Sequence, residues 1–241
     1  MDALIYTAMS GAERALRAQQ VHPNNLANLD TPGFRADLER SSSEGVPGYG
    51  YDDRRMSRLQ ADTVSAREGT LKDTGRELDV AVVGPGYLAV QGAQGEAYTR
   101  SGAIEVDADG ALTIAGRPVL GDGGPIVLPA YTQVAVAQDG TLSIQPPGQT
   151  DMQPVDRLRL VGADPADLVK DSAGLLVARD GQPLDADPKV VVRGGHLEGS
   201  NVSAIEEMIA TMSLDRDFDL QMKLYQAADS MAETGNRLIS G

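Results

Sequence analysis

Residues 78–92, LDVAVVGPGYLAVQG, decide the fold class of this chain. Two apolar runs of strand length lie on either side of Gly84-Pro85-Gly86, and these residues interrupt any helix. A short apolar run, a turn and a second short run are typical of consecutive β-strands. The stretch therefore predicts strands at 78–83 and 87–91, and a centre made of β-structure.

Similar short runs continue to residue 197. Further strands are predicted at 96–100, 103–106, 111–115, 126–128, 133–137, 141–145, 156–161, 175–178 and 189–193. Asp109-Gly110, Asp139-Gly140 and Asp180-Gly181 each follow or separate such runs, and Asp-Gly is a hairpin signal because the turn needs positive φ. Residues 78–197 are thus predicted to form a mainly antiparallel β domain, either a sandwich or an irregular barrel.

The two ends of the chain are poor in turn residues. The chain has 27 Gly and 13 Pro, but residues 1–29 contain only Gly11 and Pro23, and residues 200–241 contain no Pro. Long segments without glycine and proline favour helices. The predicted fold class is therefore α+β, with helical ends around a β centre.

The N-terminal segment carries a helical seam of small residues, spaced alternately by four and three. Its members are Leu4, Ala8, Gly11, Ala15, Ala18, His22, Asn25 and Leu29. Small side chains let a partner helix approach closely. Pro23 is expected to end or kink this helix near His22, unless a tightly packed partner holds the bend.

The C-terminal segment offers that partner. Ser200-Asn201 or Ser203 can cap a helix, and Glu206 stands at the capping-box spacing from Ser203. One apolar run comprises Val202, Ile205, Ile209 and Met212, and a second comprises Phe218, Met222, Tyr225, Asp229, Ala232, Asn236 and Ile239. The runs are out of phase, which indicates either two faces with different partners or an irregular seam.

These patterns predict three parts. Residues 1–29 with 198–241 form paired helices in a coiled-coil-like inner domain, 30–77 form an extended linker or arm, and 78–197 form the β domain. The alternative for the helices is an ordinary packing of two helices with one end exposed to water. Polar seam residues such as Asn25 and Asp229 either fix the register or simply face water.

Composition excludes several function classes. The 241 residues include 21 basic and 35 acidic side chains, and the net charge of −14 disfavours binding to nucleic acid or an anionic membrane. The absence of cysteine excludes disulfides, thiol nucleophiles and thiolate metal sites. No apolar run reaches the roughly 18 residues of a membrane-spanning helix, and the first residues lack the features of a cleavable signal peptide.

No motif points to catalysis. The G-x-G-x-x-A pattern at 84–89 needs a helix to bind a dinucleotide, and the following Val90-Gln91-Gly92 cannot sustain one. Asp107–Gly110 lacks the later ligands of a calcium loop, and His22 and His196 have no triad motif around them. We therefore expect no catalytic, cofactor-binding or metal-ligating residues, although 35 acidic side chains leave a paired-carboxylate hydrolase open.

Three segments together resemble one family. Residues 22–35, HPNNLANLDTPGFR, resemble the N-N-L-A-N-x-x-T-x-G-F-[KR] signature of bacterial flagellar rod and hook proteins. Residues 78–88 and 98–102 resemble that family's L-D-V-A-I, G-F-F and Y-T-R-x-G region, with Tyr87-Leu88 in place of two aromatics. Residues 195–202, GHLEGSNV, and the helix after them resemble its C-terminal motif. Length and the opening segment are most similar to the proximal rod members, with distal rod and hook members as alternatives.

The resemblance implies a structural function. Terminal helices pair inside, the β domain lies outside, and subunits stack helically into the hollow driveshaft of the basal body, which crosses the periplasm and transmits torque. The expected partners are copies of the chain, other proximal rod subunits and the distal rod protein, with the flagellar type III export apparatus in transit. Nucleic acid, membrane insertion and a small-molecule substrate are not expected, nor is a cofactor.

The residues expected to mediate assembly come from the two seams and the motifs. They are Leu4, Ala8, Gly11, Ala15, Asn24, Asn25, Leu26, Asn28, Thr31, Gly33, Phe34, Asn201, Val202, Ile205, Met208, Ile209, Met212, Arg216, Phe218, Met222, Tyr225 and Asp229. A secreted β-rich binding module and an enzyme with a carboxylate site are the alternatives from other classes. Helical seams at both ends of the chain favour assembly, because a binding module does not need two terminal helices that require packing partners.

Overall fold

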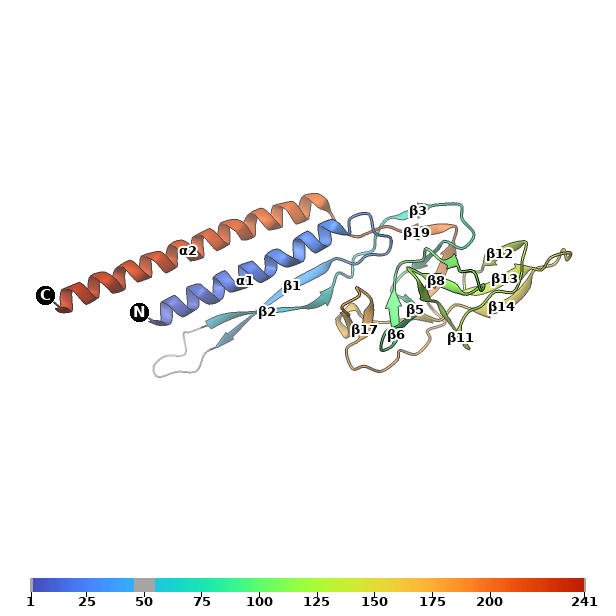
Figure 1. Cartoon of the computed structure of the whole chain (residues 1–241), viewed down its shortest axis with the longest axis horizontal. Coiled ribbons are helices and arrows are strands. Elements are labelled where there is room, and N and C mark those ends of the chain that lie inside the picture. The colour runs from blue at the N-terminus through green and yellow to red at the C-terminus, as the bar shows by residue number, and fades with distance from the viewer. Residues whose placement is uncertain (1, 46–54, 241) are drawn as a thin grey trace. The chain divides into compact units, whose positions relative to one another are not determined.

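A computed structural model describes the backbone of residues 2–45 and 55–240 and the side chains of residues 9–38, 45 and 63–238 (Figure 1). The predicted side chains of Leu4 and Ala8 lie outside the described residues. The fold is α+β, with two α-helices and many short strands, as predicted. Among the described residues, no helix is both long and apolar enough to cross a membrane.

The chain divides into two compact units. Unit 1 contains the described parts of Met1–Ala27, Asp37–Asp62 and Ser203–Gly241, and unit 2 contains Asn28–Ala36 and Thr63–Val202. The chain therefore passes between the units four times, at 27/28, 36/37, 62/63 and 202/203. The segments that flank the helices, 28–36 and 195–202, belong to unit 2.

Unit 1 holds the helices α1 (Asp2–Ala27) and α2 (Ala204–Ser240) and most of the paired strands β1 (Asp37–Gly45) and β2 (Arg55–Val64). The helix α1 continues through Pro23 to Ala27, so of the outcomes left open for Pro23 the helix does not end near His22. Hydrogen bonds of the Asn25 side chain hold its last turn in place. The amide of Glu206 donates to Ser203 Oγ at 3.4 Å, which confirms the Ser203 cap.

Unit 2 contains six small sheets. The largest has the order β15 (Leu160–Val161), β5 (Tyr87–Gly92), β6 (Gly95–Thr99), β17 (Leu176–Ala178) and β16 (Leu168–Lys170). Two three-stranded sheets are β12 (Gln133–Val136), β13 (Thr141–Gln145), β14 (Gln153–Arg157) and β7 (Glu105–Val106), β8 (Leu112–Ile114), β9 (Arg117–Pro118). The pairs are β4 (Val80–Val83) with β18 (Val191–Gly194), β3 (Leu71–Asp73) with β19 (His196–Glu198), and β10 (Leu120–Gly121) with β11 (Gly124–Pro125). The short 3-10 helix η1 (Pro165–Asp167) precedes β16.

The strand pairs of unit 2 are antiparallel, and the predicted turns mostly hold. Gly110 and Gly140 adopt φ of +83° and +85° between β7 and β8 and between β12 and β13, as two of the Asp-Gly signals predict. The segment after Gly84-Pro85-Gly86 is the strand β5, so this glycine pattern is a turn and not a dinucleotide site.

Three predictions of local structure are wrong. Asp180-Gly181 does not close a hairpin, because β17 pairs with β16 and β6 while the next strand, β18, pairs with β4. Residues 126–128 form no strand, since the amides of Ile126 and Leu128 donate to carbonyls in two different neighbours, Val119 and Gly110. The predicted single strand 156–161 is divided between β14 and β15, which belong to different sheets. The segment 30–77, predicted as an extended linker or arm, contains β1, β2 and β3.

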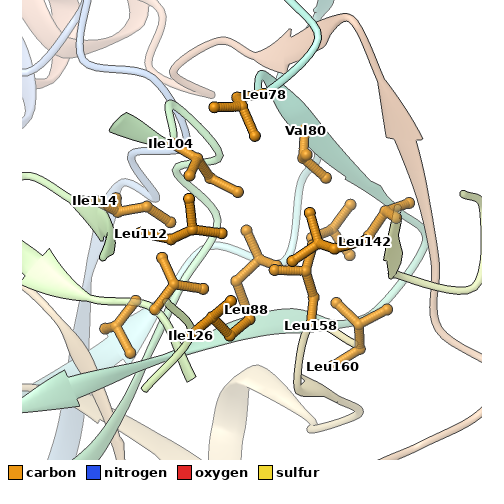
Figure 2. Close-up of a cluster of buried hydrophobic side chains, with 14 of the residues drawn as sticks. Leu78, Val80, Leu88, Ile104, Leu112, Ile114, Ile126, Leu142, Leu158 and Leu160 are labelled. Atoms are coloured by element: carbon orange, nitrogen blue, oxygen red, sulfur yellow. The ribbon is translucent and has the colours of Figure 1, made fainter. Parts of the chain in front are cut away.

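A continuous apolar cluster fills unit 2. Leu88, Leu112, Leu142 and Leu158 are at most 1% exposed and come from separate strands and loops (Figure 2). A second cluster around Tyr98 and Leu168 packs under the five-stranded sheet. Because each sheet is small, burial of these side chains is the main interaction that holds the sheets together.

Candidate assembly surface and buried ion triad

The helix α2 exposes large apolar side chains on one face. Ile205, Met208, Ile209 and Met212 are 71%, 56%, 60% and 57% exposed, at the i, i+3, i+4, i+7 spacing of one helix face. We call these four residues the α2 apolar face. Leu220, Leu224, Met231 and Leu238 extend the exposed apolar surface of the helix. An apolar stripe of this length is typical of a surface that a partner covers.

The buried positions of α2 differ from those of its exposed apolar face. Leu214 and Ala228 are 7% and 1% exposed, so α2 has a buried side as well as the exposed apolar face. The second predicted run is displaced by one residue: Asp229 is exposed beside the buried Ala228. In the single chain Asp229 therefore faces water. Phe218 and Val202 are half-buried, whereas Met222, Tyr225 and Arg216 are exposed.

Small residues of α1 are buried as the seam predicts. Ala15 and Ala18 are 5% and 0% exposed, and a Cβ added at Gly11 would lie 2.9 Å from Gln221 Cδ. The predicted site residues Leu26 and Asn24 are exposed, and Asn24 Nδ2 donates to Asp37 Oδ2 at 2.9 Å.

Asn25 is the polar seam residue that is buried, with 1% of its surface exposed. Its Nδ2 donates to Glu207 Oε1 and to the Asp37 carbonyl at 3.1 Å each, and its Oδ1 accepts from the Asp37 amide at 2.8 Å. His22 Nδ1 lies 2.5 Å from the other oxygen of Glu207. A buried amide satisfied on both sides can fix one alignment of its neighbours, because any other leaves it unpaired.

The motif residues 28–35 form a tight loop in unit 2. The Thr31 amide and hydroxyl donate to Asn28 O and Oδ1 at 3.2 and 3.0 Å. Gly33 has φ of +68°, and a Cβ there would lie 2.2 Å from the carbonyl carbon of Arg100. Only glycine fits this approach. The Lys170 Nζ lies over the Phe34 ring, 3.9 Å from the ring centre.

Asn201 joins three segments of unit 2. Its amide donates to the Phe34 carbonyl at 3.2 Å, its Oδ1 accepts from the Ala36 amide at 2.7 Å, and its Nδ2 donates to the Arg67 carbonyl at 2.7 Å. The side chain thus replaces backbone pairing between segments that run in from different parts of the sequence. In the single chain Asn201 is a structural connector.

The residues Arg35, Arg100 and Glu198 form a buried ion triad. Glu198 is 1% exposed; its Oε1 lies 2.8 Å from Arg35 Nη2, and its Oε2 lies 2.8 Å from Arg100 Nε. The Gly69 amide also donates to Oε1 at 2.8 Å. Two guanidinium groups share one carboxylate, and Arg35 Nη1 is buried without a hydrogen-bond acceptor.

Arg100 connects the ion triad to the centre of unit 2. Its Nη1 donates to the carbonyls of Gly84 and Gly86 at 2.7 Å each, in the turn between β4 and β5. Burial lowers the pKa of the Arg100 guanidinium, and the Glu198 carboxylate opposes that shift. The guanidinium also lies 5.8 Å from the centre of the Tyr87 ring, whose pKa burial raises.

Sequence reasoning did not single out the members of the ion triad. Each lies inside one of the three motif segments, 22–35, 98–102 and 195–202. One signal in the sequence could have indicated them. Each motif segment contains a charged residue outside the predicted helices, so exposure on a helix surface does not account for its presence. The residues stand 65 and 98 positions apart in sequence, and a single sequence does not show that they meet.

Comparisons with known proteins cover both ends and the centre. Residues 5–35 match the family model described as flagella basal body rod protein, and residues 81–144 match the flagellar hook protein FlgE/F/G D1 domain. Residues 193–238 match the flagellar basal body rod FlgEFG protein C-terminal model. The matches fall on the three segments that carry the resemblance.

Whole-chain relatives agree with these models. The flagellar basal-body rod protein FlgF of Escherichia coli strain K12 is 40% identical over 249 residues, covering 100% of this chain and 99% of the relative. The FlgF protein of Salmonella typhimurium shows the same identity and coverage, and that of Caulobacter vibrioides is 30% identical over 93% of this chain and 92% of its own. The chain therefore belongs to the flagellar basal-body rod protein family and is similar to its FlgF members over its full length.

Proposed function

We propose that this chain is a structural subunit of the bacterial flagellar rod, of the proximal-rod FlgF type, that assembles helically with its neighbours. The observation that carries the proposal is the α2 apolar face, whose four side chains are more than half exposed in the single chain. Removing such side chains from water stabilises an assembly by about 1.5–3 kcal/mol for each one fully buried. A subunit that is complete only in an assembly fits this distribution.

The terminal helices are proposed to pair as a coiled-coil-like inner domain, with the β domain outside it. Contacts of Glu207 with His22 and Asn25 support the pairing, as does the contact between Gln19 and Asp215. The buried small residues of α1 support a close approach of a second helix. In this arrangement the segment 30–77 is proposed to form the extended linker or arm that lies on adjacent subunits.

The proposed partners are copies of the chain, other proximal rod subunits and the distal rod protein. The proposed location is the rod where it crosses the periplasm, reached through the flagellar type III export apparatus. There the subunit transmits torque and borders the central channel. A chain without cysteine is suited to two redox environments.

Within the family, the identities favour the proximal rod over the distal rod or hook. The FlgF relatives reach 40% identity, whereas a FlgG relative from Buchnera aphidicola is 27% identical over 94% of this chain. The relatives are rod proteins, which favours a structural subunit over a secreted binding module or an enzyme.

The test replaces two residues of the α2 apolar face in a strain that lacks the chromosomal gene. The double variant Ile205→Asp, Ile209→Asp should keep the circular dichroism of the wild-type monomer and be exported, but swimming and intact rods in micrographs of basal bodies should be lost. Val127→Asp, at a 55% exposed site of unit 2, is the matched control and should swim. Normal rods with the double variant would contradict the proposal.

A further inference from the structure

Unit 2 contains three segments that adjoin the passages between the units. These boundary segments are 28–36, 63–70 and 195–202. Backbone hydrogen bonds join them: the Gly33 amide donates to the Glu198 carbonyl at 2.7 Å, Ser65 to Ala36 at 2.8 Å, and Gly199 to Thr70 at 2.8 Å. Segments that are distant in sequence are thus connected pairwise.

The backbones of these segments pack closely at two glycines. A Cβ at Gly69 would lie 2.0 Å from the Gly199 carbonyl oxygen, and one at Gly33 would lie 2.2 Å from the backbone of Arg100 and Ser101. Glycine at both positions lets two backbone segments approach more closely than a residue with a side chain would allow. The boundary segments and the chain at Arg100 and Ser101 are therefore in direct backbone contact.

The ion triad is the electrostatic centre of the same region. Arg35 comes from the first boundary segment, Glu198 from the third, and Arg100 from the end of β6 with bonds to the turn at 84–86. Without the Glu198 carboxylate, two guanidinium groups with at most 6% side-chain exposure would be buried without a counter-charge. Such uncompensated charges strongly favour opening of the site to water.

We propose that the ion triad makes the three boundary segments and the turn at 84–86 open and close as one cooperative body. Arg35, Arg100 and Glu198 are then positioning residues, which fix the points where the chain leaves unit 2 towards α1 and α2. The biological meaning of this coupling rests on the proposed function, whereas the coupling itself is a property of the monomer.

The test is amide hydrogen exchange on the full-length monomer, with Glu198→Gln as the variant. The reporters are the amides of Gly33, Gly69 and Asn201, one in each boundary segment. Of these, only the Gly69 amide bonds to the Glu198 side chain. We expect all three to exchange faster by a similar factor, about 100-fold or more, ahead of the core amide of Ile126. Acceleration of the Gly69 amide alone would overturn the proposal.

Two further variants keep the test decisive if Glu198→Gln does not fold. Arg35→Met leaves Arg100 and Glu198 as a balanced pair, so it should fold and accelerate the three reporter amides together by a smaller factor. Val134→Ala, in the core strand β12, is the control. It should not accelerate exchange of the three reporter amides more than exchange of the Ile126 amide. If Arg35→Met changes only the amides of its own segment, the proposal is wrong. This outcome is independent of whether the chain builds a rod.

Discussion

The helix α2 and unit 2 use the same kind of side chain in opposite ways. Ile205 and Ile209 of α2 are 71% and 60% exposed, whereas Ile104 and Ile126 of unit 2 are 0% and 1% exposed. Unit 2 buries most of its Leu and Ile side chains within the chain. The helix leaves much of its apolar surface exposed in the single chain, which is typical of a surface that a partner covers.

The largest effect is expected at the ion triad. Glu198→Leu should lower the free energy of unfolding of unit 2 by about 3–5 kcal/mol, because two arginines lose their shared carboxylate. Urea denaturation of the monomer, followed by circular dichroism, measures the change. Glu105→Leu, at an exposed glutamate of β7, should change stability by less than about 0.5 kcal/mol. Equal effects of the two variants would remove the special role of Glu198.

The comparison itself is tested by one substitution made in both regions. Leu112→Ala, at a side chain with 0% exposure, should cost about 2–5 kcal/mol through lost burial and a residual cavity. Leu220→Ala, at a 57% exposed position of α2, should cost less than about 0.5 kcal/mol in the monomer. A large loss at Leu220 would show that α2 is already covered within the monomer.

A pH titration tests the buried environment of Tyr98 in unit 2. Burial raises the pKa of Tyr98 from 10.0 to about 12, and its hydroxyl accepts from the Leu184 amide at 2.7 Å. The raised pKa favours the protonated phenol in the folded state, so its contribution is complete below pH 10 and lost as the pH rises to about 12. The difference in ultraviolet absorbance between the wild-type protein and Tyr98→Phe should show the tyrosinate of Tyr98 forming near pH 12. Tyr98→Phe should reduce the loss of stability over this range; an unchanged pH profile would contradict the assignment.

The smallest effect is expected at Asp229. Because this side chain is exposed, Asp229→Leu should change monomer stability by less than about 0.5 kcal/mol. If Asp229 still sets register between subunits, as its place in the predicted seam suggested, swimming should fall while export and monomer folding persist. Normal swimming and normal rods would show that the residue is merely solvated.

The sequence predicted those elements whose signal is local. The strands β5, β12 and β13 follow dense apolar runs bounded by glycine turns, and their predicted limits agree with the structure to within one residue. The strand β1 is polar, with the sequence DLERSSSEG, and such a strand has no apolar alternation to reveal it. The predicted seam of α2 is one residue away from the buried Ala228, because the spacing of apolar residues alone does not show which side of a helix is buried.

The candidate site was predicted only in part. The apolar residues Ile205, Ile209 and Met212 are found on one face of α2, as their spacing indicates. The ion triad depends on tertiary contacts between residues far apart in sequence, and no spacing rule connects them. Asn201 and Gly33 were expected to serve assembly, but the contacts described for them lie within unit 2.

The hydrogen bond from the Asn201 amide to the Phe34 carbonyl, 3.2 Å long, has a consequence for how such chains diversify. It places the chain next to the passage at 36/37 beside the chain next to the passage at 202/203, so two of the points where the chain leaves unit 2 are adjacent. A cassette with adjacent ends can be lengthened, shortened or exchanged while the host segments keep their own sequence. Unit 2 of such a protein is therefore free to evolve at a different rate from the helices.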